Sequence, residues 1–423
     1  MNNPPAEQNS EMPALRIGIL TATPHPIQTI YVPALQALPA LYTITSIHNA
    51  SDPSKPVSTT PSPDSILSDP SIDLILNFMP NEYHELYTIA ALQAGKHVMV
   101  AAPVSLSIPS AKRIEEAEKD APNRAKVFVA SARRYAPCFE EVFKMEVAGL
   151  ERIHYARCRM IAGPHAAHSA TVPALRDLNG NGNTSTNTIG VEANRVPTST
   201  STPPPTSTTT TTNQPDKKDR SHGSETRLRS LLEEVFGKHE TPNQERLALS
   251  RFLASLGCHD LGLMREALGY PDAISNISVN EPFYSALFHY NGLGNRLGSG
   301  IHSHPFTLMY ETGTDSVPRC DAQLAVYGQD KTVTIHYDLP YARGQPVRVV
   351  VETADERGGL MQTETVSPWE EAYEEELKAM YAYLVEGKEA KTTARDSLQD
   401  VRLFQTIFQQ YDRQCGTIRT PLG

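Results

Sequence analysis

The chain has 423 residues, 39% hydrophobic and 20% charged, which is long enough for two domains with buried cores. Its formal net charge of −10 argues against a nucleic-acid surface or an anionic membrane face, since both need clustered lysine and arginine. Five scattered cysteines favour reduced thiols in a cytoplasmic protein. Residues 1–13 lack the basic and apolar regions of a signal peptide and predict a disordered leader, and no apolar run is long enough to span a bilayer.

The chain opens with a predicted strand at 15–20, a helix at 30–38 and a second strand at 42–48. In a dinucleotide-binding fold, a G-x-G-x-x-G turn follows the first strand and lets the backbone approach the pyrophosphate. Here Thr21 and Thr23, with Ala22 between them, hold the first two glycine positions. We expect their side chains to obstruct a phosphate, although a longer loop that binds phosphate through threonine hydroxyls is the alternative. Asn49 stands where an acid usually follows the second strand.

The most regular stretch runs from residue 73 to residue 103. It reads as a buried strand at 74–79, a helix with apolar residues at helical spacing, and a second strand at 97–101. Gly95 ends the helix at a position that favours positive φ. Strand, helix and strand with short joints form the crossover unit of a parallel sheet.

This stretch resembles the core of the glucose–fructose oxidoreductase and inositol dehydrogenase (Gfo/Idh/MocA) family, through its order of strand, PN-x-x-H, helix, AGKHV, strand and x-x-P. The resemblance implies an NAD(P)-binding domain followed by a substrate domain. In that family the second strand usually ends in Glu-Lys-Pro with the lysine in the active site, whereas here the residues are Ala101, Ala102 and Pro103. The implied cofactor positions are Thr21, Ala22, Thr23, Asn49, Pro80, Asn81, His84 and Ala102.

The first domain is predicted to span residues 14–136. A helix at 107–119 with Ser107 as its N-cap leads to a strand at 126–130. Arg133, Arg134 and Tyr135 then match an Arg-Tyr-x-Pro segment that faces the cleft in the resembling family. A solvated arginine pair beside a packing tyrosine is an equally good interpretation.

The second domain is predicted over residues 137–412, with a tail at 413–423. Its first strand is expected at 150–161, and a Thr/Ser/Pro/Asn-rich insertion at about 179–224 predicts disorder. After helices at 225–236 and 242–256, residues 255–269 resemble the family signature D-x-G-x-H-D. His259 matches its histidine, an acid–base group by type, while Ser255 replaces its first aspartate. A structural role for a lone histidine is the alternative.

From residue 273 the pattern predicts an open, mostly antiparallel sheet and two final helices. Strands are expected at 277–279, 283–290, 306–311, 322–327, 333–337 and 347–352, and helices at 369–384 and 394–411. His302 and His304 supply only two metal ligands, so a solvated hairpin tip is favoured and no metal is expected. The fold class is therefore α/β: a Rossmann-type parallel sheet followed by an α+β domain. The resemblance suggests a homo-oligomer formed through the second sheet.

For function, the resemblance implies NAD- or NADP-dependent oxidation of a sugar, polyol or related hydroxy or keto compound. The candidate catalytic residues are His259, Tyr135 and Arg133. Because Thr21 and Thr23 replace the glycines of the first turn, we expect weakened dinucleotide binding. Because the lysine position is Ala102, we also expect loss of the lysine-dependent mechanism. Two alternatives stay open: a non-redox isomerase, lyase or cyclase that uses the same cleft, and a non-catalytic regulatory or binding protein.

Overall fold

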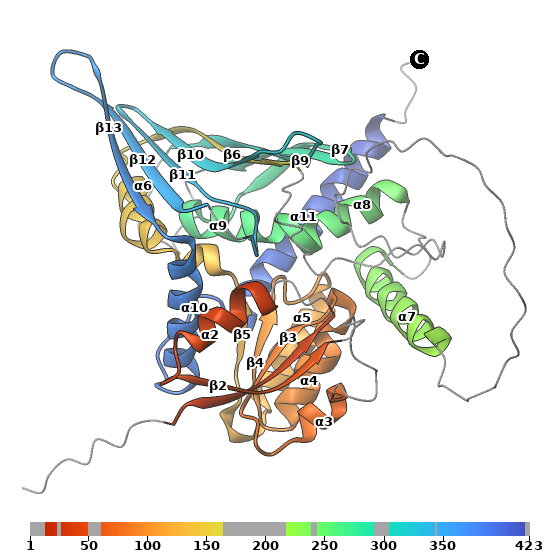
Figure 1. Ribbon diagram of the computed structural model, residues 1–423. Coiled ribbons are helices and arrows are strands. Elements are labelled where there is room, and N and C mark those ends of the chain that lie inside the picture. Colours follow the sequence, from red (N-terminus) through yellow and green to blue (C-terminus); the bar gives the residue numbers. More distant parts are fainter. Residues whose placement is uncertain are drawn as a thin grey trace, which may run out of the picture.

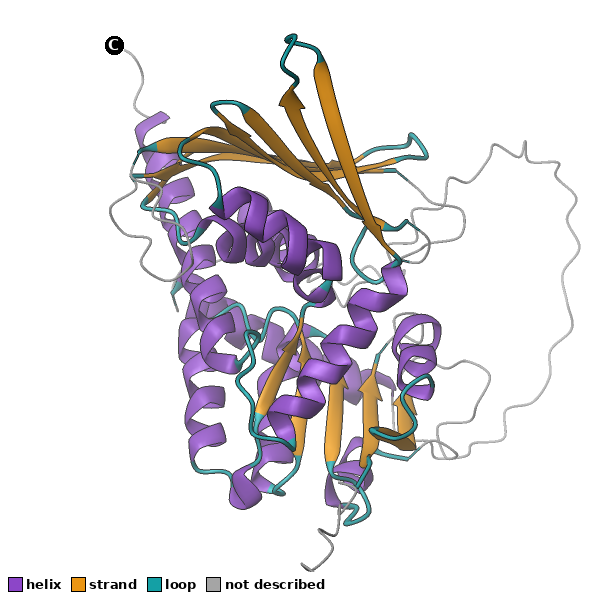
Figure 2. Cartoon of the chain, turned by 90° about the vertical axis from the view of Figure 1, so that its left-hand side faces the viewer, coloured by secondary structure: helices purple, strands orange, loops and turns teal. Residues whose placement is uncertain are grey.

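The structure, a computed structural model, describes residues 13–22, 27–49, 61–163, 217–237, 243–291, 304–342 and 345–418. It contains a parallel sheet of five strands and a larger sheet of eight strands, with helices α8 (Gln244–Phe252) and α9 (Cys258–Leu268) between them (Figures 1 and 2). The predicted fold class is confirmed.

The five-stranded sheet has the order β2-β1-β3-β4-β5, and its pairings are parallel. Its strands are β1 (Leu15–Thr21), β2 (Tyr42–Asn49), β3 (Leu74–Phe78), β4 (His97–Ala101) and β5 (Val127–Ala130). The chain leaves β1 to one side for β2 and then crosses to β3 on the other side. The topological switch point, where ligands of such sheets bind, therefore lies at the carboxyl ends of β1 and β3.

Alternate residues of these strands face two separate helical layers, as the period of a strand requires. One core joins the sheet to α3 (Pro63–Ser68), α4 (His84–Gln93), α5 (Ile108–Lys119) and the start of α11. The other face packs on α2 (Val32–Gln36) and on α10. Gly18 is needed for close packing in β1, because a Cβ there would stand 2.5 Å from Ile66 Cγ2 of α3.

Glycine and capping residues in the sequence predicted several helix ends correctly. Gly95 has φ +72° after α4, and Ser107 caps α5 by accepting a hydrogen bond from the Ser110 N–H. The helix predicted at 30–38 is different: a π-helix (Ile27–Tyr31) leads into the five-residue α2. Pro33 lies in the first turn of α2, where no N–H donor is required.

The eight-stranded sheet has the order β13-β12-β11-β10-β6-β9-β8-β7 and is antiparallel except for the parallel pair β6–β9. Its strands are β6 (Ile153–Ala162), β7 (Ala273–Asn280), β8 (Phe283–Tyr290), β9 (Phe306–Thr314), β10 (Cys320–Gly328), β11 (Lys331–His336), β12 (Val347–Ala354) and β13 (Leu360–Ser367). The sequence did not predict β13, because this edge strand is exposed along nearly its whole length and so carries no apolar alternation.

The helices of the second domain are α6 (Lys144–Ala148), α7 (Lys217–Phe236), α8 (Gln244–Phe252), α9 (Cys258–Leu268), α10 (Trp369–Leu384) and α11 (Ala394–Ile418). Two boundaries differ from the prediction. Helix α7 begins inside the segment assigned to the disordered insertion, and α11 continues into the predicted tail. Residues 1–12 and 164–216, which hold most of the predicted leader and insertion, lie outside the described residues.

Candidate active-site cleft

The switch point is built by strand register. Thr21 at the end of β1 pairs with Asn49 on one side and with Phe78 on the other. Thr21 and Ala22 are buried, whereas Asn49 is half-buried; Thr23 lies outside the described residues. Thus the sheet brings three of the predicted cofactor positions (Thr21, Ala22 and Asn49) to one edge, and two of them present almost no surface.

An aromatic cluster of Tyr31, Phe78, Tyr341 and Tyr373 covers this edge. The Tyr31 ring lies 4.8 Å from Phe78 and 5.5 Å from Tyr373, and Tyr341 lies 6.2 Å from Phe78 and 6.3 Å from Tyr31, all between ring centroids. Tyr341 comes from the second domain, between β11 and β12, and is 2% exposed. Side chains of both domains therefore fill the crevice at the switch point.

In the structure, the residues of the PN-x-x-H motif connect separate parts of the chain through hydrogen bonds. His84 is fully buried, with Nδ1 2.9 Å from the Pro103 carbonyl oxygen and Nε2 2.9 Å from that of Met79, so it ties the end of β4 to the end of β3. Burial lowers the pKa of His84 to about 4. Pro80 is buried, and Asn81 donates from Nδ2 to the carbonyl oxygen of Ala254 in the second domain at 3.3 Å.

Ala102 stands at the position of the family lysine. It borders a void of about 10 Å³, which is room for one water molecule. Around this void lie Arg134, Asp396 and Asp400, whose charges are paired: Arg134 Nη1 lies 2.6 Å from Asp396, and Arg265 Nε lies 2.8 Å from Asp400. Among the described residues that line this void, Arg134 is the only cation.

Arg133 is held by groups of the second domain. Its Nη1 donates to Asp260 Oδ1 at 2.7 Å, its Nη2 donates to the Asp338 carbonyl oxygen, and its guanidinium lies 4.3 Å from the centre of the Tyr337 ring. The other oxygen of Asp260 accepts from the Tyr310 hydroxyl at 3.1 Å. The sequence did not single out Asp260, although it follows His259 directly in the signature.

His259 lies in the first turn of α9, but it is 4% exposed and its Nε2 is buried without a hydrogen-bond partner among the described residues. Burial, with a contribution from Arg133, lowers its pKa to about 3, so the ring is neutral at physiological pH. Ser255 does not replace the family aspartate as a partner, since its hydroxyl donates to the Arg251 carbonyl oxygen in its own helix at 2.8 Å.

Tyr135 is also engaged. Its hydroxyl lies 2.8 Å from Thr392 Oγ1, and burial raises its pKa. The ammonium of Lys391 lies 4.4 Å from the centre of its ring. The structure thus brings His259 and Arg133 to the domain junction, whereas Tyr135 packs beside them in a network of paired groups.

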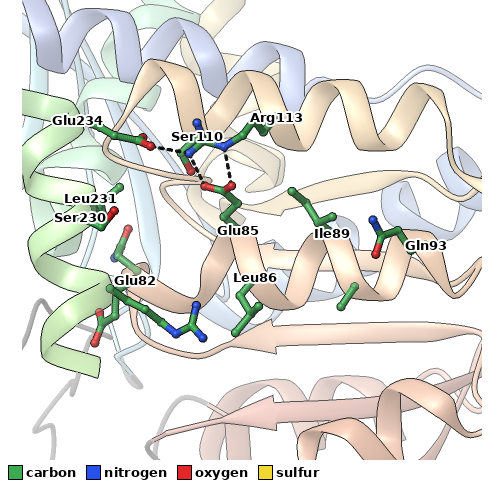
Figure 3. Close-up of a pocket in the computed structure, with 13 residues that line it drawn as sticks. Glu82, Glu85, Leu86, Ile89, Gln93, Ser110, Arg113, Ser230, Leu231 and Glu234 are labelled. Atoms are coloured by element: carbon green, nitrogen blue, oxygen red, sulfur yellow. Dashed lines mark hydrogen bonds and ion pairs between the residues drawn. The ribbon is translucent and has the colours of Figure 1, made fainter. Parts of the chain in front are cut away.

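A separate groove of about 400 Å³ lies between α4, α5 and α7 (Figure 3). Arg113 of α5 contacts Glu85 of α4 at 2.6 Å and Glu234 of α7 at 2.8 Å, so one cation joins the three helices across the groove. Leu86 and Ile89 line its apolar part. Glu85 and Glu234 therefore pair with Arg113 and hold together the three helices that form the groove.

Within the described ranges, no helix is long and apolar enough to cross a membrane. Nor do the described histidine, cysteine and acidic residues form any group of three that could hold a metal ion. Of the predicted His302 and His304 tip, only His304 lies within the described residues.

Comparison with known proteins identifies the first domain. Residues 28–129 match the Gfo/Idh/MocA family model, described as an oxidoreductase family with an NAD-binding Rossmann fold, and the resemblance seen in the sequence is confirmed. An oxidoreductase from Thermotoga maritima shares 16% identity at a TM-score of 0.57, covering 94% of this chain and 96% of that one.

Two liganded structures share the same fold. A biliverdin reductase from Synechocystis, in complex with biliverdin and NADP+, has 14% identity and a TM-score of 0.55 over 94% of this chain and 99% of its own. A lysine-to-alanine mutant of KijD10, a 3-ketoreductase from Actinomadura kijaniata in complex with TDP-benzene and NADP, has 13% identity and a TM-score of 0.55 over 94% and 98%. At these identities the likeness establishes the shared two-domain fold.

Proposed function

We propose that this chain, whose residues 28–129 match the Gfo/Idh/MocA oxidoreductases, is a divergent relative with weakened dinucleotide binding and without lysine-dependent hydride transfer. The observation that carries the proposal is Ala102, which borders a void for a single water and has only paired charges around it. A methyl group cannot orient a substrate hydroxyl or take its proton. The loss of one such group typically costs two to four powers of ten in rate.

The other candidate groups do not supply a substitute. His259 is neutral and buried, and Arg133 is paired with Asp260. Burial raises the pKa of Tyr135, so its hydroxyl stays protonated at neutral pH and no phenolate is present to act as a base. These environments support a cleft without a poised acid–base pair.

The dinucleotide part of the proposal rests on the first turn and the switch point. Thr21 and Ala22 are buried, and Pro24 and Pro26, which precede the helical segment at 27–36, have no N–H to donate to a phosphate. The aromatic cluster fills the edge that a dinucleotide crosses in this fold. The burial of the first turn and the packed aromatic rings support the proposal that NAD and NADP bind weakly.

The test is thermal unfolding of the purified chain with NAD, NADP, NADH and NADPH, with an active family dehydrogenase as the control. A ligand that binds only the folded state at about 100 times its Kd stabilises that state by about 2.7 kcal/mol, which is several degrees in Tm. We expect this shift for the control and less than about one degree for this chain. A shift of several degrees, with turnover of a sugar or polyol, would contradict the proposal.

A further inference from the structure

Tyr341 joins the two domains at the switch point. Its ring packs near Tyr31 and Phe78 of the first domain, and it also meets His259 edge to face, with centroids 5.4 Å apart. The neighbours of this single ring therefore come from the end of β3, the first helical segment and the start of α9. These aromatic rings form a cage around the Tyr341 ring.

The backbone of Tyr341 is strained. Its φ is +60°, in the left-handed region that bulky residues rarely adopt and that glycine and asparagine tolerate. The Tyr341 N–H donates to the Tyr373 hydroxyl at 3.1 Å, which holds the backbone in this conformation. Strain of this kind persists only where the surroundings impose it, and it points to a role for the side chain.

The hydroxyl of Tyr341 makes no stabilising hydrogen bond with the described residues. Its oxygen is buried without a hydrogen-bond partner among the described residues, although a buried tyrosine usually finds one. Its neighbours behave differently, because the Tyr31 hydroxyl donates to Glu376 at 2.9 Å and the Tyr373 hydroxyl accepts from the Tyr341 N–H. Tyr341 thus fits the cage by its ring alone, and it does so in a costly backbone conformation.

We propose that Tyr341 is an internal stand-in for a planar aromatic ligand: its side chain fills a cage at the switch point that otherwise accepts a ring of a nicotinamide dinucleotide. This rests on the proposed function and names one residue, besides those of the first turn, that weakens the binding. The first-domain part of the cage remains when the Tyr341 side chain is removed. In the wild-type chain a ligand must displace the Tyr341 side chain, and the energetic cost of doing so lowers the apparent affinity of the ligand. This cost is absent when the side chain has been removed.

The test uses Tyr341→Gly in the full chain, because glycine adopts a φ of +60° without strain. We expect this variant to bind NADH or NADPH at least about tenfold more tightly than the wild-type chain, as measured by fluorescence of the reduced nicotinamide. Free p-cresol, which is the tyrosine side chain as a separate molecule, should compete with the dinucleotide. Tyr341→Asn serves as a second variant, since asparagine also tolerates this conformation.

The matched control is Tyr290→Ala, which removes an equally buried tyrosine that stacks on Phe306 at 4.6 Å in the eight-stranded sheet. It should destabilise the chain and leave dinucleotide binding at the wild-type level. If the folded Tyr341 variants bind no better than wild type, or if Tyr290→Ala gains as much as they do, the inference is wrong and the proposed function stands. Tight binding by the wild-type chain would instead contradict the proposed function itself.

Discussion

The Tyr31 hydroxyl donates a hydrogen bond to Glu376 Oε2 at 2.9 Å, and this contact joins the first domain to α10 in a fully buried environment. The other carboxylate oxygen of Glu376 accepts from the Ser131 N–H. Burial raises the pKa of Glu376 to about 8, even though both hydrogen bonds favour the ionised form. A carboxyl group at the domain junction therefore titrates near physiological pH.

This titration predicts a pH-dependent stability that Glu376→Gln removes. Because the folded-state pKa lies above the unfolded value of about 4.5, the stabilising contribution is complete below that value and is lost as pH rises towards about 8. The loss is on the order of 5 kcal/mol as an upper bound. Urea unfolding of the wild-type chain and of Glu376→Gln should be measured from about pH 4.5 to about pH 8. The free energy of unfolding of the variant should rise relative to that of the wild type as the pH rises. A constant difference would mean that Glu376 does not titrate in this window.

His259 predicts the opposite dependence. Its pKa is lowered to about 3 by burial, so its contribution is complete above the unfolded value of about 6.5 and is lost as pH falls towards 3. His259→Leu also removes the buried Nε2, which has no hydrogen-bond partner among the described residues. At pH 5 we expect the variant to gain roughly 2 kcal/mol relative to its difference from wild type at pH 7.

The exposed Leu360 provides the control for that measurement, because Leu360→Ala changes no titratable group and should leave the pH profile of stability unchanged. An activity that His259→Leu abolishes without changing stability would instead favour a non-redox enzyme.

Breaking the Arg133–Asp260 pair is expected to be costly. Asp260 is completely buried, so Asp260→Asn leaves the charge of Arg133 largely uncompensated and should lower the free energy of unfolding by about 3–5 kcal/mol. The Arg157–Glu311 pair is more exposed, and Glu311→Gln should cost less than about 1 kcal/mol. Equal losses in denaturant unfolding would show that the buried pair carries no special weight.

Ala102→Lys tests whether the lysine alone can restore the family reaction. The void beside Ala102 holds one water, so a long side chain should overpack it and cost about 1–3 kcal/mol. Ala102→Met, which is of similar length and uncharged, is the matched control for packing. We expect no dehydrogenase turnover from either variant, because the switch point stays filled by Tyr341. Robust sugar oxidation by the lysine variant would overturn this interpretation of the site.

The sequence alone located most of the helices and strands and showed that the family lysine is absent. Apolar periodicity located β4 at His97–Ala101 and β8 at Phe283–Tyr290, since buried strands and helices must present apolar residues at their own period. Local turn and cap chemistry did the same for Gly95 and Ser107. The residue type at position 102, an alanine, was enough to show that the family lysine is absent.

Only the tertiary structure decided what the remaining groups contact. Tyr341 and Glu376 are hundreds of residues from Tyr31, and nothing in their local sequence shows that they meet at the switch point. The same holds for His259, whose neutral state depends on burial and on Arg133. Burial, ring packing and pKa depend on contacts between residues that are far apart in the sequence. These contacts exist only in the folded protein, where the two domains pack together, so the periodicity of a single segment cannot predict them.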